Sequence, residues 1–165
     1  MKELLKEHDN KLSNFVQDSA PIIDICAGGK HSIVLTGNGG LYTFGFGDQG
    51  QLGLRTTDNA KKPTLVTDFD GIRIMGISAG SHHSVVQTAK GDIYACGLNK
   101  DGQLGLGHTK SRKQFTHLTC FGGVSINKFM AGGNHTWFLI DEFMPFKSNY
   151  TFPEALGPAK ANKIE

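Results

Sequence analysis

Three histidines recur at a fixed interval and are the first side chains to consider for metal binding or catalysis. His31, His83 and His135 are spaced 52 residues apart. A zinc site needs three or four ligands around one point, whereas equivalent positions of successive structural units are separated in space. We therefore predict that these imidazoles are buried and hydrogen-bond a neighbouring turn. We predict neither a metal site nor a cofactor.

A glycine-rich segment has the spacing of a nucleotide-binding loop. Gly45, Gly47 and Gly50 form a G-x-G-x-x-G pattern after an expected strand. Such a loop binds pyrophosphate only where a helix begins, because the amide groups of the helix meet the phosphates. The next residues, Gln-Leu-Gly-Leu-Arg, are too rich in glycine for a helix, and the second copy has Asn99 in place of Gly47. We interpret these glycines as residues that permit left-handed turns.

Five basic side chains form the other candidate site. They follow a Gly-Gln-Leu-Gly-Leu segment that occurs twice: Lys61, Lys62, Lys110, Arg112 and Lys113. Two interpretations stay open, a solvated loop or a basic surface that contacts an acidic partner or phosphates. The net charge of +2 is far from that of a dedicated nucleic-acid-binding protein, so we do not expect a nucleic acid as the main partner. Spacing singles out no nucleophile with a base, and we do not predict an enzyme.

The composition indicates a globular chain. Hydrophobic residues make up 38% of its 165 residues, and 22 residues are glycine. No apolar run approaches the roughly 18 residues of a membrane-spanning helix, and the N-terminal residues mix charges where a secretory signal would be apolar. Three cysteines without metal-like spacing do not suggest a disulfide framework. We expect an intracellular protein without a membrane span, located in the cytoplasm or the nucleus, with an organelle left open.

The histidines belong to a repeat that organises the chain. Similar segments begin at Ala27, Ala79 and Ala131, and residues 50–54 recur as residues 102–106, again 52 positions later. Without a gap, residues 22–73 and 74–125 share 22 identical positions. We therefore divide residues 22–140 into two repeats, 22–73 and 74–125, and a partial third, 126–140.

Each repeat has the pattern of short strands separated by glycine turns. In the first repeat we expect strands at 22–27, 31–36, 41–44 and, more weakly, 64–67. The second repeats this plan at 74–79, 84–88, 93–96 and 116–119. Four strands in about 50 residues, repeated in tandem, are typical of a β-propeller blade. The predicted fold class is all-β.

The two linked signatures resemble the regulator of chromosome condensation repeat. In that family a strand ends in glycine, a Gly-Gln-Leu-Gly-x-Gly segment and a loop with proline follow, and a Gly-x-x-His element completes the repeat. The matching residues in this chain are Gly28, His31, Gly45, Gly50, Gln51, Leu52, Gly53, Gly80, His83, Gly97, Gly102, Gln103, Leu104, Gly105, Gly132 and His135. The first repeat departs at Arg55, where the last glycine is expected, and the second has Phe115 at the position of Pro63. The resemblance implies a propeller, usually of seven blades.

The repeat region is too short to close a ring. Residues 22–140 amount to about 2.3 repeats, whereas a propeller needs at least about four blades. Unpaired strand edges invite association, so we expect other chains, or a larger propeller, to complete the structure. Residues 1–21 have the pattern of an amphipathic helix or arm, and residues 141–165 that of an extended tail with proline and aromatic residues.

Two functions follow from the resemblance. The first is a protein-interaction or scaffold module, the role of many such repeats. The second is guanine nucleotide exchange on a Ran-like small GTPase, in association with chromatin. The exchange activity relies on a complete propeller face and an added wedge hairpin, and the sequence shows neither. We therefore favour the interaction module.

Overall fold

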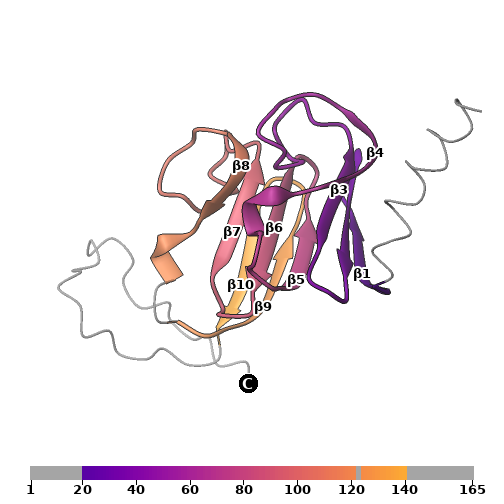
Figure 1. Cartoon of the computed structure of the whole chain (residues 1–165). Helices are drawn as coiled ribbons and strands as arrows, with labels where there is room; N and C mark the ends of the chain where they lie inside the picture. The colour runs from indigo at the N-terminus through magenta and orange to yellow at the C-terminus, as the bar shows by residue number, and fades with distance from the viewer. Residues whose placement is uncertain (1–19, 122–123, 141–165) are drawn as a thin grey trace, which may run out of the picture.

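The computed structural model describes residues 20–121 and 124–140, which form three antiparallel sheets (Figure 1). The first sheet has its strands in chain order: β1 (Ile22–Ala27), β2 (His31–Thr36), β3 (Leu41–Gly45) and β4 (Ala60–Leu65). The second has the same order: β5 (Ile74–Ala79), β6 (His83–Thr88), β7 (Ile93–Gly97) and β8 (Arg112–His117). The third pairs β9 (Ile126–Ala131) with β10 (Thr136–Ile140). Single-turn 3-10 helices follow the four-stranded sheets: η1 (Thr67–Phe69) and η2 (Thr119–Phe121).

The second and third strands of each large sheet form a tight hairpin. In the first sheet β2 pairs with β3 so that His31 lies opposite Gly45 and Leu35 opposite Leu41. The turn contains Gly39 at φ +89°, a conformation that glycine adopts readily. In the second sheet the register is the same 52 positions later, with His83 opposite Gly97. The repeat in the sequence is therefore a repeat of strand register.

The core lies between the sheets. Ile33, Leu35 and Leu41 of the first sheet pack with Ile74 and Val86 of the second in one buried cluster. A second cluster joins the second sheet to the third, with Val85 and Ile93 against Ile126 and Phe138. Consecutive sheets therefore stack face to face, and their first strands β1, β5 and β9 lie next to one another (Figure 1). Burial on both faces explains the consecutive apolar residues in the middle of β2, Ile33 to Leu35, and of β6, Val85 and Val86.

The fourth strands differ from the prediction. They begin and end earlier than expected, because residues 60–65 and 112–117 pair with β3 and β7, and the 3-10 helices contain Thr67 and Thr119. The outermost strands β4 and β8 expose half or more of their side chains, so most of their residues are polar and give no hydrophobic alternation. The apolar signal comes from residues after the strand, such as Val66 and Phe69, which are buried.

Two of the predicted segments lie at the ends of the chain. The helix or arm expected within residues 1–21 and the tail expected in residues 141–165 lie outside the described residues, apart from positions 20 and 21. Within residues 20–121 and 124–140, no helix is long and apolar enough to cross a bilayer.

Candidate functional site

The repeated histidines join one sheet to the next. His31 begins β2, and its Nε2 atom lies 2.9 Å from the hydroxyl of Ser84 on β6 of the following sheet. The Ser84 hydroxyl donates its proton to the carbonyl oxygen of Gln51, at 2.6 Å, in the loop after β3. Since that hydroxyl has only one proton, it accepts from Nε2–H of His31. The imidazole, the hydroxyl and the carbonyl form an inter-sheet relay.

The same relay occurs a second time, 52 residues later. Nε2 of His83 lies 2.9 Å from Oγ1 of Thr136 on β10. Thr136 in turn donates to the carbonyl oxygen of Gln103, at 2.7 Å. The histidines were expected to hydrogen-bond a neighbouring turn, but their partners are hydroxyl groups on a strand of the next sheet. The geometry explains why: each histidine begins the second strand, where its ring points across the gap between sheets.

Both relay histidines are held neutral. His31 and His83 are almost completely buried, and burial, followed by the charges of neighbouring histidines, lowers the pKa of each imidazole to about 4. With Nε2 donating, Nδ1 carries the lone pair, and it has no hydrogen-bond partner among the described residues. Protonation at Nδ1 would therefore bury an unpaired N–H group together with a charge.

The signature glycines permit close approach of backbone to backbone. A Cβ on Gly28 would collide with the ring of His31 and with the carbonyl oxygen of Gly80 on the next sheet. A Cβ on Gly80 would collide in the same way with the ring of His83 and the carbonyl oxygen of Gly132. Gly45 and Gly97, at φ +107° and +111°, lie against the backbone at the start of β2 and β6. These glycines are requirements of sheet stacking.

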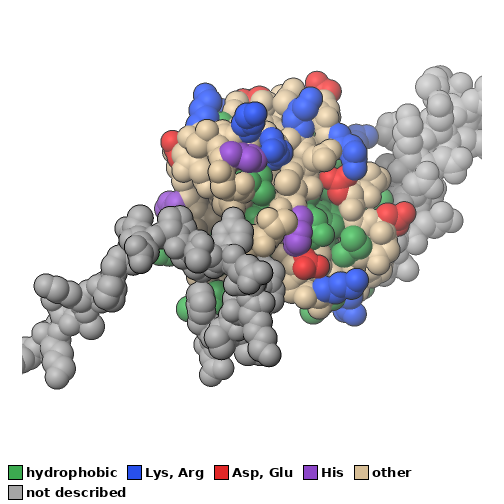
Figure 2. Space-filling model, turned by 90° about the vertical axis from the view of Figure 1, so that its left-hand side faces the viewer, with side chains coloured by type: hydrophobic (Ala, Val, Ile, Leu, Met, Phe, Trp, Pro, Cys, Tyr) green, Lys and Arg blue, Asp and Glu red, His purple; other side chains and the backbone are tan. Residues whose placement is uncertain are grey.

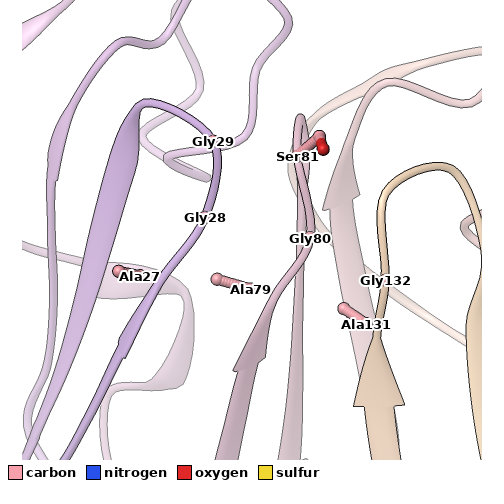
Figure 3. Close-up of a pocket in the computed structure, with 8 residues that line it drawn as sticks. All are labelled: Ala27, Gly28, Gly29, Ala79, Gly80, Ser81, Ala131 and Gly132. Atoms are coloured by element: carbon pink, nitrogen blue, oxygen red, sulfur yellow. The ribbon is translucent and has the colours of Figure 1, made fainter.

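An open groove runs over the ends of the innermost strands (Figure 3). It is lined by backbone and small side chains: Ala27, Gly28, Gly29, Ala79, Gly80, Ser81, Ala131 and Gly132. The hydroxyl of Ser81 is the polar side-chain group in this lining. Such a lining carries no charge and no paired acid and base, so we assign it no chemistry.

The Gly-Gln-Leu-Gly segments form turns that their own glutamines stabilise. Oε1 of Gln51 accepts from the backbone N–H of Gln49, at 2.9 Å, and Oε1 of Gln103 accepts from Asp101, at 3.0 Å. The leucines of these segments, Leu52 and Leu104, are buried. The turns that follow β3 and β7 therefore have structural roles, and no helix starts after Gly50 or Gly102. This arrangement agrees with the rejection of the nucleotide-loop interpretation.

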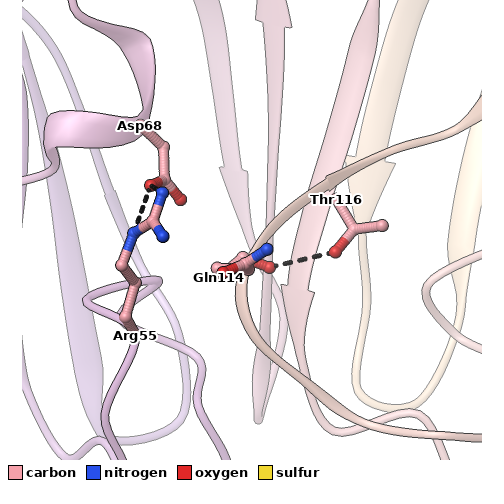
Figure 4. Close-up of polar contacts among 4 residues, drawn as sticks. All are labelled: Arg55, Asp68, Gln114 and Thr116. Carbon is pink, nitrogen blue, oxygen red and sulfur yellow. Dashed lines mark hydrogen bonds and ion pairs between the residues drawn. The ribbon is translucent and has the colours of Figure 1, made fainter.

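Arg55 replaces the expected glycine without changing the backbone. It adopts φ +65°, close to the +71° of Gly107 at the equivalent position. Its guanidinium forms an ion pair with Asp68, with Nη2 2.6 Å from Oδ1 (Figure 4). The backbone N–H of Arg55 donates to the carbonyl oxygen of Lys113 on the next sheet, at 2.8 Å. The ion pair and this inter-sheet bond hold an arginine in a conformation that costs an ordinary residue about 1–2 kcal/mol.

We expect Arg55→Ala to lower the free energy of unfolding by about 1 kcal/mol more than Arg55→Gly. Both substitutions remove the ion pair with the largely buried Asp68 carboxylate, but only glycine relieves the left-handed strain. Chemical denaturation of the two variants beside the wild type measures this difference. Equal stability of the two variants would show that the φ of Arg55 carries no strain.

Phe115, the other departure from the repeat pattern, is a packing residue. Its ring lies on Gly53, where a Cβ would meet the ring edge, and its centroid is 5.2 Å from that of Phe69. Pro63, at the equivalent position of β4, is exposed. The phenylalanine therefore fills the space between the first and second sheets, whereas the described residues place no sheet against Pro63.

The predicted basic site is located mainly on strands. Lys61 and Lys62 lie on β4 and Arg112 and Lys113 on β8, so the expectation that the group occupies loops is correct only for Lys110. Arg112 is partly engaged, since its guanidinium lies 2.8 Å from Nε2 of His108. The four lysines are exposed. Figure 2 shows Lys and Arg side chains gathered on the upper part of one face, with acidic groups near them.

The outward faces of the first and third sheets expose positions that are partly or fully buried between sheets in the other repeats. Ile25 is 68% exposed, whereas its equivalents Ile77 and Phe129 pack against the two inter-sheet clusters. At the other end Trp137 is 69% exposed, and its equivalents Ile33 and Val85 are fully buried. We call these two surfaces the terminal faces, the one around Ile25 and the one around Trp137.

Metal-ligating side chains do not converge within the part of the chain that the structure describes. In residues 20–121 and 124–140, no group of three His, Cys, Asp or Glu residues is arranged to hold a metal ion. Cys26, Cys96 and Cys120 are free thiols.

Comparison with known proteins agrees with this geometry. The regulator of chromosome condensation (RCC1) repeat matches residues 38–87 and 90–139, and a second description of this repeat matches residues 22–51 and 76–103. The chain is similar to the human X-linked retinitis pigmentosa GTPase regulator, with 37% identity over 69% of this chain and 11% of that protein. It is 32% identical to the human E3 ubiquitin-protein ligase HERC2 over 70% of this chain and 2% of the ligase.

The fold has solved counterparts. The crystal structure of Prp20p from Saccharomyces cerevisiae, a protein studied for its binding to Gsp1p and histones, superposes with a TM-score of 0.65 and 26% identity. The match covers 72% of this chain and 31% of Prp20p. The chain thus spans less than a third of the length of each of these three proteins.

Stacked sheets with repeated register and adjacent first strands define consecutive blades of a partial β-propeller. With both repeats matched over most of the described residues, the chain belongs to the regulator of chromosome condensation repeat family.

Proposed function

We propose that this chain is a protein-interaction module whose terminal faces bind further propeller blades, supplied by other chains. The observation that supports this proposal is the exposure of Ile25 and Trp137 at positions that are partly or fully buried between sheets in the other repeats. Burial of apolar surface contributes about 25 cal/mol per Å², and each face offers a large exposed apolar side chain.

The relay supports the same proposal, because each terminal face carries half of one. His135 is exposed and has no following sheet in the described structure, although His31 and His83 each reach a hydroxyl there. At the other end, Ser32 is the equivalent in the first repeat of Ser84 and Thr136. The hydroxyl groups of Ser84 and Thr136 each accept a hydrogen bond from a histidine of the preceding sheet. A further blade at either face would complete a relay.

Native mass spectrometry of the purified chain at micromolar concentration tests the proposal. We expect species heavier than the 17.8 kDa chain, since exposed faces of this kind associate. A cooperatively folded monomer as the only species would contradict the proposal, because the chain would then cover both faces by itself.

The basic residues on β4, β8 and the loop before β8 remain a prediction as a partner-binding surface. The four lysines are exposed, and all but Lys110 lie on the outermost strands of adjacent sheets. This placement supports contact with an acidic partner while the terminal faces bind blades.

Nucleotide exchange is the second candidate, because 26% identity links the chain to Prp20p. We expect no acceleration when the purified chain is mixed with Ran that carries a fluorescent guanine nucleotide. The two full repeats align without an insertion, so they contain no added hairpin that could wedge into a GTPase. Faster nucleotide release at micromolar chain concentration would show that exchange is the function.

A further inference from the structure

Strand β10 has an open edge where the other two sheets continue. β2 pairs with β1 on one side and β3 on the other, and β6 pairs likewise with β5 and β7. Within residues 20–121 and 124–140, β10 pairs with β9 alone. Among the described residues no strand lies along the other edge of β10, and an edge of this kind forms a template for another strand.

The two complete sheets define what this edge accepts. β3 and β7 lie antiparallel to their neighbours, with Gly45 and Gly97 opposite the first residue of β2 and β6. Two residues before the glycine stands a fully buried small side chain, Thr43 or Ala95. Four residues before it stands a buried aliphatic side chain, Leu41 or Ile93. Both strands also have a tyrosine after the aliphatic residue, so they share the pattern Leu/Ile-Tyr-Thr/Ala-x-Gly.

The glycine is the most restrictive position of this pattern. A Cβ on Gly45 would lie 2.6 Å from the carbonyl oxygen of Lys30 and 2.8 Å from Cα of His31. A Cβ on Gly97 would meet His82 and His83 in the same way. Both glycines have positive φ. A strand that pairs with β10 in the same register therefore needs glycine opposite His135.

The chain's own sequence does not supply such a strand at the next repeat position. The residues that follow Ile93–Gly97 by 52 positions are Pro145, Phe146, Lys147, Ser148 and Asn149. Proline lacks the N–H group of the aliphatic position, lysine stands at the buried small position, and asparagine replaces the glycine. The matching strands of a second copy are already paired on both sides.

We propose that the open edge of β10 binds an extended segment of a partner protein with the pattern Leu/Ile-Tyr-Thr/Ala-x-Gly, as an added antiparallel strand. This inference rests on the proposed interaction function and names the kind of partner that the face around Trp137 takes. The glycine of the segment lies opposite His135, its small residue opposite Trp137 and its aliphatic residue opposite Leu139.

Trp137 provides the measurement, because it is the single tryptophan of the chain, lies on β10 and is 69% exposed. The probe is a peptide of residues 40–46, Gly-Leu-Tyr-Thr-Phe-Gly-Phe, added to the whole chain with tryptophan excited selectively. The matched control peptide has alanine in place of the glycine that corresponds to Gly45. We expect a saturable blue shift of Trp137 emission with the first peptide, and binding about tenfold or more weaker with the second.

Three results would overturn the proposal. The first is no change of Trp137 emission up to millimolar peptide. The second is equal binding of both peptides, which would indicate apolar association without strand register. The third is self-association of the chain that buries Trp137, seen as a blue shift that rises with chain concentration, and that the first peptide leaves unchanged, which would show that the peptide does not compete for the face around Trp137. Native mass spectrometry of the chain without peptide decides the proposed function separately, so failure of one does not imply failure of the other.

Discussion

Gly50→Ala should lower the free energy of unfolding by about 3 kcal/mol or more, whereas Gly102→Ala should lower it by about 1 kcal/mol. The two glycines occupy the same position of successive repeats and have nearly the same backbone, φ +81° and +77°. A Cβ on Gly50 would lie 2.7 Å from the carbonyl oxygen of Arg112 and 2.8 Å from Cα of Lys113, on β8 of the next sheet. A Cβ on Gly102 would have nothing within 4 Å.

Comparison of the two variants separates the energetic cost of backbone strain from the cost of disturbed sheet stacking. Both variants carry the strain of an alanine at positive φ, but only Gly50→Ala forces two sheets apart. Denaturant unfolding followed by circular dichroism measures both values under the same conditions. Equal losses of stability would contradict the close approach of the first turn to β8.

Acid should destabilise the fold in the window from pH 6.5 down to about 4. His31 and His83 have pKa values lowered from 6.5 to about 4 in the folded chain, chiefly by burial. Between these values the unfolded chain binds more protons than the folded chain, so the free energy of unfolding falls as pH falls. Each histidine contributes about 1.4 kcal/mol per pH unit, and the total reaches about 3 kcal/mol for each imidazole at the low end.

Denaturant unfolding at about pH 7, just above the window, and at about pH 6 and 5, inside it, tests this dependence. The matched variant is His31→Gln, whose amide retains an N–H donor for Ser84 but does not titrate. We expect this variant to lose about half of the slope that the two relay histidines produce together. A variant with the full wild-type slope would contradict the assignment of His31 as a buried neutral imidazole.

Most of the fold could be predicted from the repeat period. The limits of the exposed fourth strands could not. The second and third strands of the two four-stranded sheets carry apolar side chains because they are largely buried, so residues 31–36 and 93–97 are recognisable as strands. The fourth strands are exposed, and their true limits at Ala60 and Arg112 follow from pairing with β3 and β7. Hydrophobic patterning detects burial and gives no information about an exposed edge strand.

The relay shows what a single repeat could not reveal. The histidine and its period were visible, and so was the hydroxyl residue that follows each histidine: Ser32, Ser84 and Thr136. The partner of His31, however, is the hydroxyl of the next repeat, 53 residues away. That pairing depends on how one sheet stacks on another, which local sequence does not encode. The ion pair of Arg55 with Asp68 depends on the same three-dimensional arrangement.

The central claim is that the terminal faces are binding surfaces, and sedimentation velocity of an Ile25→Lys variant tests it most directly. The matched control is Met75→Lys, an exposed apolar residue on β5 whose equivalent in the third repeat is the polar Asn127. We expect the wild type and Met75→Lys to sediment as assemblies, and Ile25→Lys to shift to the monomer, because it places a charge where Ile77 and Phe129 pack between sheets. Sedimentation of all three proteins at the same rate would contradict the account.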